Sequence, residues 1–199
     1  MPVYNNKPTS AICATLSELE RQEGNVDRAK EILLYGLKTC FTEKGQLLLA
    51  LAWLEEDAYN NPDEAYKLIE LAQKQEPKSV QVLVAKANME LRLNKFANAR
   101  ATLHQATKLP SDDGKHYTML GTLEAESGNF REAQRLLLEG SRLFPGDFFL
   151  LQRLGTLEAK HGSAKRAQEI FSEAIVIQPH APTFVAWAIL EETLGNMVR

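Results

Sequence analysis

The side chains best suited to catalysis or metal binding are four histidines, two cysteines and a series of regularly spaced glutamates. The histidines form no HExxH motif and no paired-ligand spacing: His104, His116, His161 and His180. Cys13 and Cys40 fit no metal or redox spacing, so we expect small, reduced core residues. The chain also lacks a P-loop, a GxGxxG motif and a GxSxG elbow. The sequence therefore predicts a protein that is not an enzyme, with no catalytic residues, no metal site and no cofactor.

The glutamates recur with a period of about 34 residues, and the members of this column are Glu20, Glu55, Glu90, Glu124, Glu158 and Glu191. A Gly or Asn follows four positions later in five of the six places. Side chains that occur once per stacked helix pair are ~9–10 Å apart, which is too far to converge on one catalytic centre. We therefore expect each glutamate to form a hydrogen bond or ion pair between neighbouring helices and so to order the stack.

The elements that position these residues follow from an internal repeat. The hexapeptide LGTLEA occurs at 120–125 and again, one period later, at 154–159, and columns of small residues and of proline keep the same period. The fold class predicted is all-α, an α-solenoid of antiparallel helix pairs forming a single repeat domain over 1–199. Its units are 9–43, 44–79, 80–113, 114–147, 148–180 and an incomplete 181–199.

Each unit is expected to hold one helix before its Gly-Asn turn and one after it. The apolar positions recur at intervals of three and four, the helical period, and no alternating run predicts a strand. Gly121 and Ala133 are expected where two helices of one unit cross, and Ala106 and Gly140 where a unit meets the next. The predicted helices cover 9–23, 26–39, 44–59, 62–76, 79–93, 96–108, 113–127, 130–143, 147–161, 164–177 and 181–194.

Composition excludes several classes of protein. The hydrophobic fraction is 44% and the charged fraction is 25%, as in folded chains. A formal charge of -3 and a pI near 5.9 give no overall attraction to nucleic acid or anionic lipid. No apolar run approaches the ~18 residues of a membrane span, so no membrane partner is expected. The lead Met1–Lys7 has no signal-peptide core, so we expect either that the protein acts where it is made or that the sequence is a fragment.

The repeat resembles the tetratricopeptide repeat and, more specifically, its half-a-TPR (HAT) variant, which is associated with RNA-processing proteins. The residues that carry this resemblance are Leu19-Glu20, Gly24-Asn25 and Ala29-Lys30, then Leu123-Glu124, Gly128-Asn129 and Ala133, then Leu190-Glu191 and Gly195-Asn196. Within HAT proteins, residues 144–191 look most like the chloroplast factors that mature photosystem II transcripts. The resemblance implies a right-handed superhelix, a role in messenger-RNA stabilisation and a plastid location if the chain is part of a longer precursor; otherwise the nucleus or cytoplasm is expected.

In superhelices of this type the first helix of each unit lines the concave wall. The resemblance places eleven polar or aromatic residues there as candidate RNA- or partner-binding positions: Gln22, Trp53, Gln81, Asn88, Arg92, Lys115, Thr118, Thr122, Gln152, Thr156 and Lys160. Amides and hydroxyls at one per unit suit the reading of single bases, and Lys or Arg suits phosphates. The alternative is a solvated helix face. For Trp53 and Trp187 the alternatives are a core or seam position and a base-stacking position.

Two functions remain open at this point. The first is a HAT/TPR protein of RNA metabolism that holds single-stranded RNA against its concave wall. The alternative is a scaffold that binds a peptide or partner subunit, and self-associates through the helix at 181–194. Acidic residues on the same wall favour the scaffold, because RNA-binding surfaces are normally basic; these are Glu18, Glu56, Asp57, Glu126 and Glu192.

Overall fold

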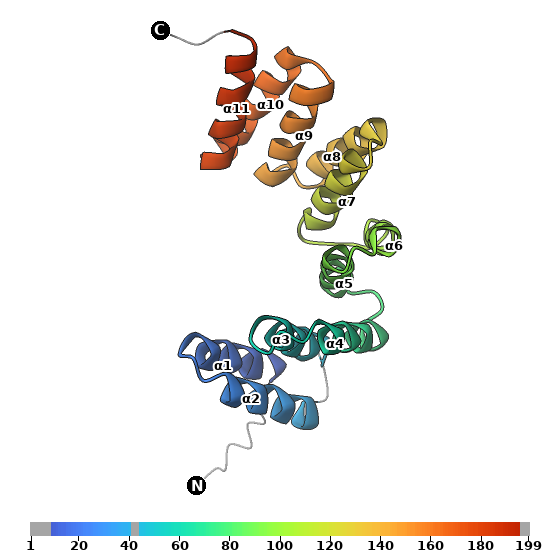
Figure 1. Cartoon of the computed structure of the whole chain (residues 1–199), viewed down its shortest axis with the longest axis vertical. Coiled ribbons are helices and arrows are strands. Elements are labelled where there is room, and N and C mark those ends of the chain that lie inside the picture. Colours follow the sequence, from blue (N-terminus) through green and yellow to red (C-terminus); the bar gives the residue numbers. More distant parts are fainter. Residues whose placement is uncertain (1–8, 41–43, 196–199) are drawn as a thin grey trace. The chain divides into compact units, whose positions relative to one another are not determined.

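The computed structural model describes residues 9–40 and 44–195, and every regular element within these ranges is an α-helix (Figure 1). Met1–Lys7 and Asn196 lie outside the described residues. The helix bounds agree with the repeat register to within about two residues, which confirms the all-α class. The helices are α1 (Ser10–Gln22), α2 (Val26–Thr39), α3 (Lys44–Asp57), α4 (Pro62–Gln75), α5 (Val80–Arg92), α6 (Phe96–Ala106), α7 (Lys115–Glu126), α8 (Phe130–Leu143), α9 (Phe148–His161), α10 (Ala164–Ile177) and α11 (Ala181–Thr193).

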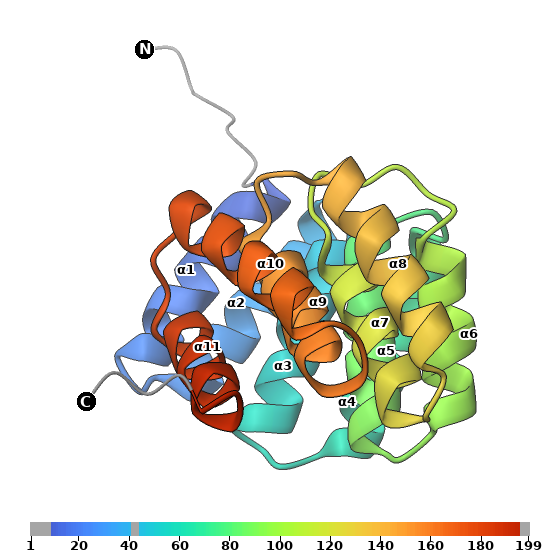
Figure 2. The same cartoon turned by 90° about the horizontal axis from the view of Figure 1, so that it is seen from above.

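The chain divides into two compact units, Met1–Thr102 and Leu103–Arg199, with the boundary inside α6. In the first unit α1 packs on α2 and α3 packs on α4, while α1, α3 and α5 contact one another in succession. In the second unit α7 packs on α8 and α9 packs on α10, and α9 also contacts α7 and α11. The α9–α10 pair can be followed in both views, Figure 1 and Figure 2. The prediction of one continuous repeat domain stays a prediction.

Tight turns join the two helices of a pair, and their geometry explains the Gly-or-Asn column. Gly24, Asn94 and Gly128 have φ between 57° and 83°, a region in which only Gly and, to a lesser degree, Asn are at ease. The glutamate carbonyl accepts a hydrogen bond from the amide five positions later, as in Asn25 N to Glu20 O at 2.8 Å. The second turn contains one extra residue, so Asn60 takes the positive φ and the bond runs from Asn61 N to Glu55 O.

The turn after α9 departs from this geometry. Gly162 has a φ of -125° rather than a positive value. The Glu158 carboxylate folds back over this turn, where it accepts a hydrogen bond from Ser163 N at 3.3 Å, and a Cβ at Gly162 would overlap it. The glycine here therefore leaves room for this carboxylate and does not adopt a left-handed backbone.

Small residues allow neighbouring helices to approach closely, as the repeat predicts. A Cβ on Gly121 would lie 2.6 Å from the Leu137 side chain of α8. A Cβ on Gly140 would touch both Tyr117 of its own unit and Leu150 of the next, at 2.8 and 2.9 Å. Both predicted crossing positions are confirmed by this geometry.

The glutamate column links successive helix pairs. The carboxylate of Glu55 in α3 forms an ion pair with the ammonium group of Lys30 in α2, with 2.6 Å between Oε1 and Nζ. The same relation recurs one repeat later and again in the second unit, in the pairs Tyr66–Glu90, Gln134–Glu158 and Gln168–Glu191. The expectation that the glutamates bond between neighbouring helices and order the stack is thereby confirmed for four of the six: Glu55, Glu90, Glu158 and Glu191.

Two interior predictions have different outcomes. Cys13 and Cys40 are free and buried, and burial is the main cause that raises the pKa of the Cys13 thiol. Trp187 is partly buried against the core formed by Ala167, Phe171 and Leu190, as a seam position requires. The prediction of a core or seam position is wrong for Trp53, whose side chain is 60% exposed.

Candidate functional site

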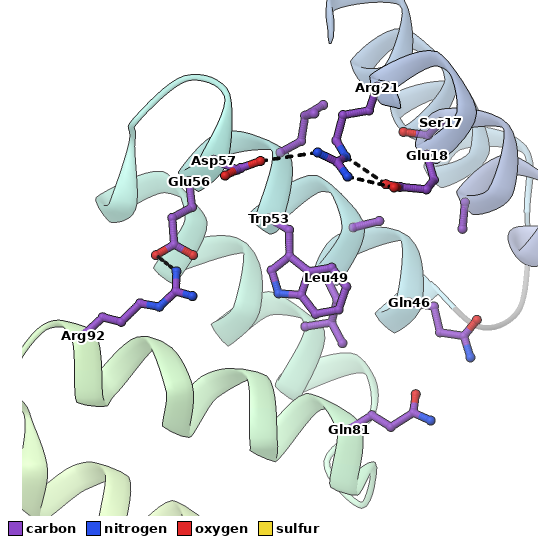
Figure 3. A pocket seen from close by; sticks show the side chains of 13 residues that line it. Ser17, Glu18, Arg21, Gln46, Leu49, Trp53, Glu56, Asp57, Gln81 and Arg92 are labelled. Atoms are coloured by element: carbon purple, nitrogen blue, oxygen red, sulfur yellow. Dashed lines mark hydrogen bonds and ion pairs between the residues drawn. The ribbon is translucent and has the colours of Figure 1, made fainter. Parts of the chain in front are cut away.

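Helices α1, α3 and α5 enclose a groove of about 610 Å³ within the first unit, called here the α1/α3/α5 groove (Figure 3). Its floor is apolar and includes Leu49, Ala50 and Leu54. Trp53 projects from α3 into the middle of the groove. The remaining lining residues are Ala14, Ser17, Glu18, Arg21, Gln46, Glu56, Asp57, Gln81 and Arg92.

The charges of this groove gather where α1, α3 and α5 end. Arg21 of α1 forms two bonds to the Glu18 carboxylate, at 2.8 and 2.9 Å, and reaches Asp57 of α3 at 3.4 Å. The two bonds from Arg21, with a third from Gln22, hold the pKa of Glu18 at about 2. Arg92 of α5 pairs with Glu56 of α3 at 2.5 Å. Both arginines that line the groove are thus neutralised by carboxylates.

Uncharged amides occupy the opposite end of the groove. Gln46 lies in the first turn of α3 and Gln81 in the first turn of α5, and both are exposed. Figure 3 shows the two amides on the far side of Trp53 from the Arg92–Glu56 pair. A carboxamide can both donate and accept, which suits the N–H and C=O groups of a peptide backbone.

A smaller groove of about 250 Å³ lies in the second unit between α7 and α9, called here the α7/α9 groove. Arg153, Thr156 and Lys160 form one edge from α9, and Thr122 and Glu126 form the other from α7. The remaining lining residues are Gly121, Ala125, Leu137, Leu157 and His161.

The structure distributes the eleven predicted wall residues over both units. Trp53, Gln81 and Arg92 line the α1/α3/α5 groove, and Thr122, Thr156 and Lys160 line the α7/α9 groove. Five others lie outside the lining of either groove: Gln22 and Asn88 are exposed, Thr118 and Gln152 are half-buried, and Lys115 is exposed and paired with Asp113 at 3.3 Å. As binding residues, all eleven stay predictions.

Sequence reasoning missed several residues that the structure brings to the grooves. Arg21 and Gln46 line the first groove, and Arg153 and His161 line the second. Arg153 precedes Thr156 by three positions and Lys160 by seven, which is the spacing of one helix face. That spacing is the signal that would have found it.

The C-terminal helix α11 carries apolar side chains that its neighbours leave uncovered. Phe184, Val185 and Ile189 are 47%, 58% and 55% exposed. The predicted self-association through this helix stays a prediction.

The part of the chain that the structure describes contains neither a metal-binding cluster nor a membrane-spanning helix. No group of three His, Cys, Asp or Glu side chains there is arranged to hold a metal ion. None of the helices in the same ranges has the length and apolar character needed to span a bilayer.

No protein-family model and no curated protein matches the sequence. Solved structures, in contrast, match almost the whole chain. The type IV pilus biogenesis factor PilW matches with a TM-score of 0.75 at 18% identity, over 94% of this chain and 86% of that one. A tetratricopeptide repeat protein from Parabacteroides merdae matches with a TM-score of 0.67 at 16% identity, over 94% and 72%.

A third match is YrrB, described as a TPR protein with an unusual peptide-binding site. Its TM-score is 0.60 at 16% identity, over 94% of this chain and 92% of that one. At these identities the likeness concerns the fold. The fold is an all-α helical-repeat solenoid of the tetratricopeptide type.

Proposed function

We propose that the protein is a non-enzymatic scaffold that binds an extended segment of a partner protein in the α1/α3/α5 groove. The observation that carries the proposal is Trp53, which is 60% exposed over the apolar floor of that groove. Large exposed aromatic side chains are favoured at the centre of protein interfaces, because covering them removes much apolar surface from water. The peptide-binding site named for YrrB, which has the same fold, supports this choice.

The charges of the groove favour a protein segment over RNA. A surface that binds RNA presents unpaired lysines or arginines to the phosphates. Here Arg21 and Arg92 are both engaged by carboxylates, and the lining holds three carboxylates against two guanidinium groups. An RNA backbone would have to break these pairs and approach the excess negative charge.

The same excess indicates what the partner segment carries. The Asp57 side chain is 74% exposed, and its contact with Arg21 is long at 3.4 Å. A lysine or arginine of the partner would meet this carboxylate while an adjacent apolar side chain covers Trp53. The expected ligand is therefore an extended segment with a basic residue next to an apolar one, its backbone held by Gln46 and Gln81.

RNA processing and a plastid location do not form part of this proposal. They rest on the resemblance to chloroplast transcript-maturation factors, and the matched structures named above offer no counterpart to it. RNA binding enters as an outcome of the test.

The test is a panel of immobilised random peptides of about ten residues, which span ~33 Å when extended. The purified protein is expected to bind a subset enriched in Lys or Arg beside an apolar residue. Trp53→Thr should lose binding, because it removes the indole and leaves the residue type that Thr122 and Thr156 supply at the equivalent position of later repeats. Trp187→Phe is the matched control and should keep binding.

Two results would overturn the proposal. One is a peptide panel on which Trp53→Thr and the parent protein bind equally. The other is saturable binding of single-stranded RNA that weakens with salt and depends on Trp53, since this would make the groove an RNA site.

A further inference from the structure

The α7/α9 groove differs from the first groove in the state of its cations. Arg153 and Lys160 form no ion pair with any described residue, and Glu126 is the one carboxylate among the residues that line the groove. The permanent cations therefore outnumber the carboxylates two to one. In the first unit, by contrast, Arg21, Arg92 and Lys30 are all compensated.

The two cations stand at a defined separation. Arg153 and Lys160 are seven positions apart on α9 with Thr156 between them, so they share one face and are ~10 Å apart along the helix axis. An extended chain advances ~3.3 Å per residue. Two carboxylates three residues apart in an extended segment of polyproline II conformation would match the pair, because three residues make one turn of ~9 Å and side chains three positions apart then share one face.

The hydroxyl groups of the groove are oriented to accept hydrogen bonds. Thr122 donates to the carbonyl oxygen of Thr118, and Thr156 donates to that of Gln152, both at 2.8 Å. Each hydroxyl proton is thus used within its own helix, and the oxygen lone pairs remain for an N–H donor. Peptide backbones supply N–H donors, whereas phosphates supply acceptors alone.

The floor and the end of the groove are apolar. Leu137 and Leu157 form the floor together with Gly121, which lacks a side chain. The imidazole of His161 is stacked on the Phe130 ring, with 3.6 Å between the two centroids. One face of the imidazole is therefore already covered. Among the described residues that line this groove, His161 is the one aromatic side chain, so they do not form the stacking platform that single-stranded nucleic acids use.

We propose that the α7/α9 groove is a second docking site, which takes an extended acidic segment of a partner protein. Two carboxylates of the segment pair with Arg153 and Lys160, its backbone N–H groups donate to Thr122 and Thr156, and an apolar residue between the acids covers Leu137 and Leu157. The site belongs to the second unit alone and does not depend on the α1/α3/α5 groove.

The experiment uses the full chain and a fluorescein-labelled, unstructured peptide with Glu at every third position and Leu and Ser between. Fluorescence anisotropy at low salt is expected to show saturable binding. The double charge reversal Arg153→Glu/Lys160→Glu should weaken it about tenfold or more, because it turns two attractions into repulsions. The matched control Arg142→Glu/Lys165→Glu makes the same charge change at exposed positions outside the groove, and should keep binding nearly unchanged.

Two further experiments test the charge preference of the groove and the location of the bound peptide. The same peptide with Lys in place of Glu should bind the Arg153→Glu/Lys160→Glu variant better than the parent protein. Trp53→Thr should bind the acidic peptide normally, so a loss there places the peptide in the α1/α3/α5 groove and overturns the inference. Equal weakening in both charge-reversal variants, no binding by the parent protein, or preferential binding of an oligouridylate that Arg153→Glu/Lys160→Glu abolishes would each overturn it too.

Discussion

The ammonium group of Lys30 lies 2.6 Å from a carboxylate oxygen of Glu55, and this contact joins the second helix of one repeat to the first helix of the next. Lys30 follows the fully buried Ala29, and in later repeats the residue after the buried alanine again reaches the next glutamate. The glutamate is retained while its partner varies among Lys, Tyr and Gln. The column therefore specifies an acceptor at this interface rather than a salt bridge as such.

Removing the acceptor is expected to destabilise the first unit. Glu55 is 5% exposed, so Glu55→Ala leaves a cavity and removes the carboxylate that pairs with the Lys30 ammonium group. Because Lys30 is about a third exposed and can rehydrate, we expect a loss of about 1–3 kcal/mol of unfolding free energy, below the value for a fully buried pair. Urea unfolding measures it.

The control for this prediction is Glu31→Ala, an exposed position on α2 that should change stability by less than ~0.5 kcal/mol. Glu55→Gln keeps an acceptor oxygen and should fall between the two. Equal stabilities of Glu55→Ala and Glu31→Ala would show that the acceptor does not hold the repeats together.

A second prediction concerns a close helix approach in the last full repeat, between Gly155 and Phe171. A Cβ at Gly155 would lie 2.6 Å from a ring carbon of Phe171, which is fully buried. Gly155→Ala should therefore cost about 1–3 kcal/mol, which outweighs the ~1 kcal/mol that alanine gains from helix propensity. Phe171→Leu in the same chain should recover part of the loss, since it removes the obstructing ring.

Gly146→Ala serves as the comparison, because a Cβ there would meet no atom within 4 Å. It should leave the thermal midpoint nearly unchanged. An equal fall in both variants would mean that the space beside Phe171 does not explain the need for glycine at 155.

Most of the fold could be predicted from the sequence because the repeat supplies its own comparison. A position such as Gly121 is matched by Gly155 one period later, and both sit under a bulky side chain of the following helix. The Asn60–Asn61 insertion was visible as a shift in the same register. The exception after α9 was not, because the column shows the same glycine there although its φ is negative in the structure.

The sites were harder to predict, because their distinctive residues differ in type from those at the equivalent positions of the other repeats. Trp53 occupies the position that Thr122 and Thr156 hold in later repeats, so the register placed it on the wall, while its residue type suggested the core. The register proved the better guide. Arg153 was missed for the opposite reason: its column otherwise holds mainly small or apolar residues, such as Ala50, Ala85 and Met119.

A third prediction follows from a buried imidazole in the second unit. His116 is 1% exposed, and its Nδ1 has no hydrogen-bond partner among the described residues. Burial lowers the pKa of His116 below its ordinary value of 6.5, although Asp113 acts in the opposite direction. The unfolded chain thus binds a proton more readily than the folded one, so stability falls as the pH drops below about 6.5.

The variant that tests this is His116→Leu, since the equivalent position one repeat later is the fully buried Leu150. Urea unfolding between pH 7 and pH 5.5 should show a steeper decline for the parent protein, by at most ~1.4 kcal/mol per pH unit. At pH 7 the variant should be at least as stable, because it removes an unsatisfied buried nitrogen. Parallel pH profiles would show that His116 does not contribute to the decline.

The last prediction concerns the electrostatic surroundings of Trp53. The chain has two tryptophans, so Trp187→Phe leaves Trp53 as the single indole. Its fluorescence should be quenched readily and, with each quencher scaled to its effect on free N-acetyltryptophanamide, more by caesium than by iodide at low ionic strength, because three carboxylates and two guanidinium groups surround it. The difference between the quenchers should shrink as salt is added and the Debye length falls to ~8 Å at 0.15 M.

The control is Trp53→Phe, which leaves Trp187 as the single indole. It should be quenched less, since Trp187 is partly buried and its Nε1 donates to Glu191 at 2.8 Å. Stronger scaled quenching by iodide would mean that the arginines dominate the field of the groove, and the expected preference for a basic partner segment would then be wrong.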